Sequence, residues 1–258
     1  MKIVVLVKQV PDTEDERKLD LTTGILDREA GESVADEINE RALEVALAYK
    51  DSNKGTEVVV LSMGPDEAKK ALRKGLQMGA DSAVHVVDAS LTGADAVQTA
   101  TVLAAALRDT GFDLVVAGNE STDGRGGVVP AMVSELLGLP LLGSLNEVWI
   151  LPERVAGERR EESGSSTVSA PLPALISVTE RAAEARFPNF KGIMTAKRKP
   201  LNQLELSQFP NDSATATITR TKVLATTERP ARAAGVKIID EGDAGAKLAE
   251  FLVAGRLI

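Results

Sequence analysis

The sequence predicts an α/β fold built on an open parallel sheet, with a small hairpin and an extended C-terminal arm. Short apolar runs alternate with helical patterns, and a glycine-rich loop follows one of these runs. Strands that alternate with helices are typical of parallel βαβ units. The 258 residues are 43% hydrophobic and 26% charged, which is ordinary for a globular protein that buries a core.

The predicted strands are short apolar runs, compact enough to be buried on both faces of a sheet. They are Ile3–Val7, Val58–Leu61, Val84–Val87, Leu114–Ala117 and Ala174–Val178.

The predicted helices repeat apolar residues at helical spacing between these strands. Their approximate ranges are 36–50, 65–79, 93–110 and 132–137. Pro65 suits the start of the second helix, and Gly79 and Gly138 suit the ends of the second and fourth.

Three stretches interrupt this alternation. Residues 11–35 form a long first connection, with a turn expected at Thr23 and Gly24. Residues 146–170 are polar and predict a small hairpin. After about residue 180 the alternation is expected to stop.

The remaining chain predicts an arm that packs on something else. A Thr-rich extended stretch (213–227) and a short helix (244–254) follow, and so long a tail without a core of its own must lie against its own domain or a partner. We therefore expect a Rossmann-like domain over residues 1–185 and a partner-binding region over 186–258.

Composition excludes several classes of site. The absence of cysteine excludes a disulfide framework, a thiolate metal site and a cysteine nucleophile. The single histidine, His85, lies inside an apolar run and is expected to be a core residue. A net charge of −8 argues against nucleic-acid binding. No apolar run is long enough to span a membrane, and we expect a cytoplasmic protein. With no cysteine and one histidine, we expect no metal site.

The glycine-rich loop is the most informative segment. Residues 118–129 contain four glycines and lead from a predicted strand into a helix. Glycines there let backbone amides approach a phosphate, and the helix N-terminus adds donors. Arg125 can supply countercharge, and neighbouring polar side chains can bond ribose or base. Taken alone, the loop is equally well interpreted as a flexible turn.

Other nucleotide-binding motifs are absent. The first strand exits into residues 8–11 without the glycines of G-x-G-x-x-G, and the chain has no G-x-x-x-x-G-K-[ST]. Glycines after the fourth strand instead resemble adenine-nucleotide-binding, Rossmann-like folds, in which the first and fourth strands straddle the crevice.

An ordered series of segments resembles the electron-transfer flavoprotein beta family and runs along nearly the whole chain. The segments are 2–12, 62–65, 76–81, 118–129, 186–199 and 232–237. Many relatives have an Asn-Pro pair and an aromatic residue where this chain has Asp36-Glu37-Ile38, and an aromatic near Thr13.

The resemblance implies an electron-carrier subunit with no catalytic residue of its own. A larger alpha subunit would hold most of the FAD, and this chain would hold one AMP and grip the alpha subunit with its arm. Carried over by position, the cofactor-binding residues are Leu6, Asp36, Met63, Asn119, Glu120, Ser121, Thr122, Asp123, Gly124, Arg125, Gly126, Gly127, Val128 and Val129.

A basic segment over residues 186–199, here called the recognition segment, carries five positive charges and no negative ones. By itself it is a basic surface loop or a weak nucleic-acid patch. The resemblance implies instead that it docks into partner dehydrogenases, with Phe190 as the exposed anchor. The residues assigned to partner recognition are Arg186, Phe190, Lys191, Ile193 and Met194.

The implied function is to accept electrons from flavin dehydrogenases, such as acyl-CoA dehydrogenases, and pass them to a quinone oxidoreductase. One alternative is a bifurcating member of the family, whose beta subunit binds a second FAD in place of AMP. Another is a stand-alone nucleotide-binding regulatory protein similar to universal stress proteins. An adenylate-forming enzyme would need a Ser-Gly-Gly loop or an H-x-G-H motif, and neither is present.

Overall fold

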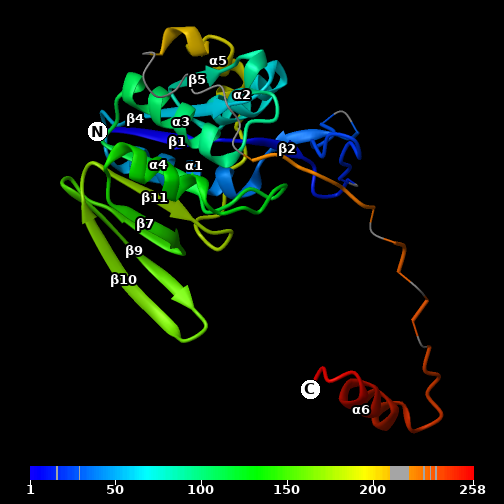
Figure 1. The fold of residues 1–258 in the computed structure, drawn as a ribbon. Helices are drawn as coiled ribbons and strands as arrows, with labels where there is room; N and C mark the ends of the chain where they lie inside the picture. Colours follow the sequence, from blue (N-terminus) through cyan, green and yellow to red (C-terminus); the bar gives the residue numbers. More distant parts are fainter. Residues whose placement is uncertain (16, 29, 210–220, 229, 233, 236) are drawn as a thin grey trace.

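The fold is centred on a seven-stranded sheet whose neighbouring strands are all parallel (Figure 1). The computed structural model describes residues 1–258 apart from 16, 29, 210–220, 229, 233 and 236. The strand order is β12-β5-β4-β1-β6-β11-β7. These strands are β1 (Lys2–Leu6), β4 (Glu57–Met63), β5 (Ser82–Val86), β6 (Leu114–Gly118), β7 (Leu141–Leu145), β11 (Ala174–Val178) and β12 (Leu201–Leu204). The predicted α/β class is confirmed.

Helices cover both faces of this sheet. The α-helices are α1 (Glu37–Ser52), α2 (Lys69–Met78), α3 (Ala96–Thr110), α4 (Val129–Leu137), α5 (Phe190–Ala196) and α6 (Ala244–Ala254). Short 3-10 turns are η1 (Asp66–Ala68), η2 (Ala89–Leu91) and η3 (Leu206–Gln208). Helices α1 and α2 pack against one face, and α3 and α4 pack against the other.

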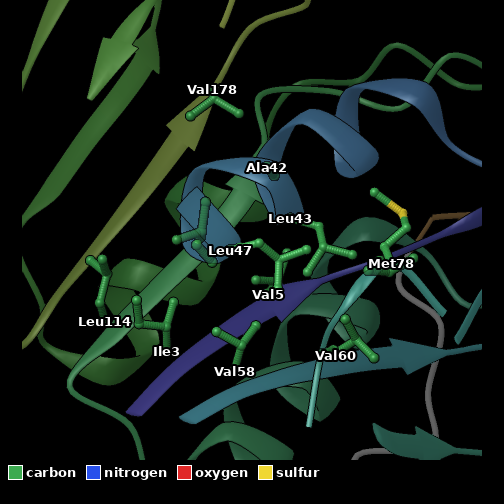
Figure 2. Packing of buried hydrophobic residues seen from close by; sticks show 14 of the residues in the cluster. Ile3, Val5, Ala42, Leu43, Leu47, Val58, Val60, Met78, Leu114 and Val178 are labelled. Carbon is green, nitrogen blue, oxygen red and sulfur yellow. The ribbon is translucent and has the colours of Figure 1, made fainter. Parts of the chain in front are cut away.

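The core consists of two apolar layers, one on each face of the central strand β1. Ile3 and Val5 face α1 and α2, whereas Val4 and Leu6 face α3 and α4. Figure 2 shows the first layer, in which the side chains of the sheet meet Leu43 and Leu47 of α1. Because both faces are covered, the inner strands are continuous apolar runs, as parallel sheets require.

The sequence pattern predicts the five inner strands but neither edge strand. At one edge, β7 is interrupted by Gly143 and by Ser144, whose φ is 55°. At the other, β12 carries the polar pair Asn202 and Gln203 and pairs with β5. The expectation that the α/β alternation stops near residue 180 is therefore wrong, because the sheet gains a strand at residue 201.

Two small antiparallel sheets occupy the predicted interruptions. The expected hairpin is a three-stranded sheet of β8 (Glu147–Ile150), β9 (Arg154–Glu161) and β10 (Gly164–Pro171). In the first connection β2 (Gln9–Pro11) pairs with β3 (Ser33–Ala35), and Gly24 at the predicted turn has a φ of 69°.

The chain between β11 and β12 crosses the face of the sheet that α1 and α2 cover. Strand β11 lies next to one edge, and β12 forms the other. On the way, the Ala183 carbonyl accepts a hydrogen bond from Arg41 of α1, and α5 packs against α2. The recognition segment thus lies outside the layer of helices.

The C-terminal arm runs away from the sheet and ends in the predicted helix α6 (Figure 1). The expected Thr-rich stretch begins among residues outside the described part of the chain, and its described end, 221–227, has no regular structure. Near the sheet, the Thr226 hydroxyl donates to the Leu21 carbonyl and the Thr221 amide donates to Asp95.

Candidate functional site

A topological switch lies between β1 and β6. The chain builds outward from β1 through β4 to β5 and then returns to add β6 on the other side of β1. Open parallel sheets bind ligands at the carboxyl ends of the strands at such a point. Here those ends are Leu6 and Gly118, so the glycine-rich loop leaves from the expected crevice.

Asp36 fixes this loop from the opposite side of the crevice. It caps α1, where its Oδ1 accepts hydrogen bonds from the amides of Ile38 and Asn39 at 3.0 and 3.3 Å. Its Oδ2 accepts from the amide and hydroxyl of Thr122 at 2.6 and 2.9 Å. The side chain is fully buried, so its carboxylate is engaged within the chain. A contact of Asp36 with AMP stays a prediction.

Lys8 provides a second tie that the sequence reasoning missed. Its Nζ lies 2.7 Å from Asp123 Oδ1 and 3.1 Å from Ser121 Oγ, and its amide donates to Asn39. Burial acts to raise the pKa of Asp123, but the Lys8 ammonium and hydrogen bonds outweigh it and hold that pKa below its usual value. The signal available in the sequence was a cation placed directly after the first strand.

The glycines leave the backbone of the loop uncovered. A Cβ built on Gly126 meets no atom within 4 Å, and one on Gly124 meets only Ser121 Oγ at 4.0 Å. Gly127 and Arg125 adopt φ values of 64° and 48°, which turn the chain into α4. The Arg125 guanidinium is 3.3 Å from Glu120, at the surface.

Asn119 supplies a buried acceptor at the end of β6. Its backbone amide donates to the Val178 carbonyl at 2.8 Å, which holds the start of the loop against β11. Its Oδ1 is buried and has no hydrogen-bond partner among the described residues. A buried acceptor without a partner costs free energy unless a ligand or water supplies a donor. This atom and the open glycine backbone therefore fit a nucleotide with a phosphate and donor groups.

The other predicted cofactor residues lie at the ends of β1 and β4 and at the start of α4. Leu6 is buried and Met63 packs against the same apolar cluster, at the ends of β1 and β4. Val128 is half exposed, and Val129 packs partly into that cluster as the first residue of α4.

The recognition segment projects apolar side chains into solvent. Asn189 caps α5 by accepting a hydrogen bond from the Gly192 amide at 2.7 Å. Phe190 is 79% exposed and Met194 61%. Ile193 and Lys191 are also exposed, whereas Ala196 is buried. Arg186 differs, because its guanidinium forms ion pairs with Glu44 and Asp51 of the same chain.

The described residues form neither a metal site nor a membrane-spanning helix. No group of three or more His, Cys, Asp or Glu is arranged to hold a metal ion. None of the described helices is long and apolar enough to cross a membrane.

Comparison with known proteins decides the family. The model of the electron transfer flavoprotein domain matches residues 23–209. The electron transfer flavoprotein subunit beta of Mycobacterium leprae is 49% identical over 264 residues, 99% of each chain. That of Megasphaera elsdenii is 34% identical over 271 residues, with both chains covered completely. The chain belongs to the electron transfer flavoprotein beta-subunit family.

Family membership confirms the resemblance seen in the sequence. The chain is an electron-transfer protein of a flavoprotein family, and the family implies a partner electron transfer flavoprotein subunit. This family membership argues against the alternative that the chain is a stand-alone regulatory protein. Another relative, the caffeyl-CoA reductase-Etf complex subunit CarD of Acetobacterium woodii, is 36% identical over 78% of this chain and 77% of its own.

Proposed function

We propose that this chain is the beta subunit of a heterodimeric electron-transfer flavoprotein that binds AMP at the switch between β1 and β6. In this proposal a larger alpha subunit holds most of the FAD. When bound, FAD supplies the redox chemistry, and the protein groups hold and position it. The chain is a carrier rather than an enzyme, and a cytoplasmic location remains part of the proposal.

The observation that carries the AMP site is the combination of an open glycine backbone and the unpartnered Oδ1 of Asn119. The ties from Asp36 and Lys8 hold the loop in this form through side chains of the chain itself. A loop that is already ordered loses less conformational entropy when a nucleotide binds. AMP in this crevice would be structural and would join the first helix, the loop and α4.

The proposed electron route runs from flavin dehydrogenases, such as acyl-CoA dehydrogenases, through the FAD to a quinone oxidoreductase. The support is the recognition segment, in which exposed apolar side chains stand beside Lys191 and Lys197. An apolar anchor among positive charges suits a partner surface with an apolar pocket and an acidic rim.

A substitution in the glycine backbone tests the AMP site. Gly126→Val fits the local backbone, because φ at Gly126 is not positive and space there is open, but its side chain would stand where a phosphate approaches. We expect the purified heterodimer to lose most of its AMP and keep its FAD, measured by nucleotide chromatography after denaturation. Ser163→Val, at the exposed turn between β9 and β10, is the control and should retain both. A native heterodimer without AMP would contradict the assignment.

The same measurement of AMP and FAD content distinguishes the simple carrier from the bifurcating alternative. One similar chain is named as a subunit of a caffeyl-CoA reductase-Etf complex, so a relative of this chain is named as part of a reductase complex. Two FAD per heterodimer and no AMP would favour a second flavin in the crevice. One FAD and one AMP would favour the simple carrier.

A further inference from the structure

The recognition segment is anchored at its first residue by Arg186. Its Nε and one terminal nitrogen form a two-point contact with Glu44 at 2.6 and 2.7 Å, and its backbone amide donates to the same carboxylate at 3.2 Å. The same terminal nitrogen also lies 2.9 Å from Asp51 Oδ2. The hydrogen bonds that its side chain donates to Glu44, more than any other contact, raise the pKa of Arg186 above its ordinary value. Both acids belong to α1, so the start of the segment is fixed to that helix.

The last residue of the segment, Lys199, is anchored to α2. Its Nζ donates to the carbonyls of Leu76 and Ala80 at 2.9 and 2.6 Å. A lysine at this position satisfies free carbonyls at the helix end and complements the negative end of the helix dipole. Burial lowers the pKa of Lys199 from its ordinary value.

The middle of the segment also rests on α2. A Cβ at Gly192 would overlap the carbonyl of Gln77, so only glycine lets α5 approach the last turn of α2 this closely. Ala196 is buried in the apolar layer between the sheet and helices α1 and α2. The segment is thus fixed to α1 at its start, to α2 at its end, and to α2 between them.

The side chains that face outward contrast with this fixed backbone. Phe187 is 93% exposed and Phe190 79%. Large apolar side chains held in solvent by a fixed backbone are suited to docking, because a rigid surface gives up less freedom when a partner binds.

We propose that Arg186 and Lys199 are positioning residues that hold the recognition segment ready for docking, and that Arg186 does not contact the partner itself. The proposal rests on the docking function proposed above. It changes the role assigned to Arg186 from the sequence, since Glu44 and Asp51 already occupy the guanidinium.

Amide hydrogen exchange of the heterodimer tests the anchoring without any partner dehydrogenase. Arg186→Lys keeps the charge but loses the fork that holds Glu44 at two points. We expect faster exchange over residues 187–198, and Lys199→Met should speed exchange at the end of the same stretch. The control is Arg181→Gln, which replaces an exposed arginine 3.8 Å from Glu180 in the preceding loop. It should leave exchange over residues 187–198 unchanged.

Kinetics with an acyl-CoA dehydrogenase and its substrate test the consequence. We expect Arg186→Lys to raise the KM for the heterodimer about three- to tenfold, the effect of having to order a loosened surface, with kcat and FAD content unchanged. If Arg186 acts through the segment, it should have little further effect when Phe190→Ala is already present, because residues acting through one contact are not additive.

Each result has a separate meaning. Unchanged amide exchange in Arg186→Lys would overturn the anchoring role. Full additivity with Phe190→Ala would mean that Arg186 contacts the partner directly, and would also overturn it. A normal rate for Phe190→Ala alone would instead remove the docking function, and with it the consequence proposed for Arg186.

Discussion

At the scale of single residues, buried polar groups determine how the crevice is built. Asp36 joins the start of α1 to Thr122, 86 positions away, and its carboxylate accepts four hydrogen bonds from this chain. Asn119 presents an acceptor that no described residue satisfies. Asp36 therefore shapes the loop and Asn119 contributes an unsatisfied acceptor to it, although both are polar residues at ends of regular elements.

His85 gives a prediction for the dependence of stability on pH. It is fully buried in β5, its Nε2 is 3.1 Å from the Gly64 carbonyl, and burial is the main cause that lowers its pKa from 6.5. In the unfolded chain the imidazole takes up a proton below about pH 6.5, whereas in the folded chain it does so only at a lower pH. Stability is therefore complete above pH 6.5 and falls as the pH decreases toward the folded pKa.

We expect His85→Gln to remove this loss. Urea unfolding of the heterodimer from pH 8 to pH 5 should show wild type losing up to about 1.4 kcal/mol per pH unit more than the variant below pH 6.5. The histidines of the partner subunit are common to both proteins and cancel in the difference. Parallel curves would show that His85 titrates normally in the folded state.

At the scale of elements, what could be predicted depended on burial. Strands such as β1 and β11 are buried on both faces and stand out as apolar runs, whereas the edge strands β7 and β12 have no such run. The glycine-rich loop could be found because glycine is visible in the sequence. The partners of Lys8 and Asp36 could not be predicted, since they are residues that only the fold brings together, although the cation itself is visible directly after the first strand.

Helix α5 carries the prediction for docking. Truncating a buried aromatic anchor at an interface commonly costs about 2 kcal/mol or more. Phe190→Ala should therefore slow electron transfer from an acyl-CoA dehydrogenase at least about tenfold, the factor that 1.4 kcal/mol represents. The visible spectrum and FAD content should not change. Neutralising Lys191 should slow association mainly at low ionic strength.

The control for this experiment is Leu21→Ala, which removes an exposed apolar side chain from the first connection. Its transfer rate should match that of wild type. Equal rates for Phe190→Ala and wild type would reduce α5 to a basic surface element without a docking role.

At the scale of the whole molecule, the C-terminal arm leaves apolar side chains exposed to solvent. In the described part of the arm α6 buries none of its residues, and Phe251 and Val253 are 50% and 62% exposed. Apolar surface of this kind is normally covered by another protein. The partner subunit that the family implies is the occupant we expect.

Co-expression tests this expectation. The chain expressed alone should aggregate or have a low melting temperature. Co-expression with an alpha subunit should restore its stability, because a partner that binds only the folded state stabilises that state. A chain ending at Phe209 should aggregate less when alone and should fail to co-purify with the alpha subunit. A monodisperse, thermally stable full-length chain without a partner would contradict the proposal.

The path of the recognition segment outside α1 and α2 has a consequence for how such a carrier can evolve. Phe187 and Phe190 lie largely in solvent, and the proposed nucleotide site is built by other residues at the ends of β1 and β6. If the proposed docking role holds, substitutions at these two positions should alter the choice of redox partner without disturbing the core or the crevice. Arg186, Gly192 and Lys199 lack that freedom, because each is bound to a helix beneath. Among descendants of one ancestral carrier, the outward positions should diverge with the dehydrogenases they serve while the anchoring positions stay fixed.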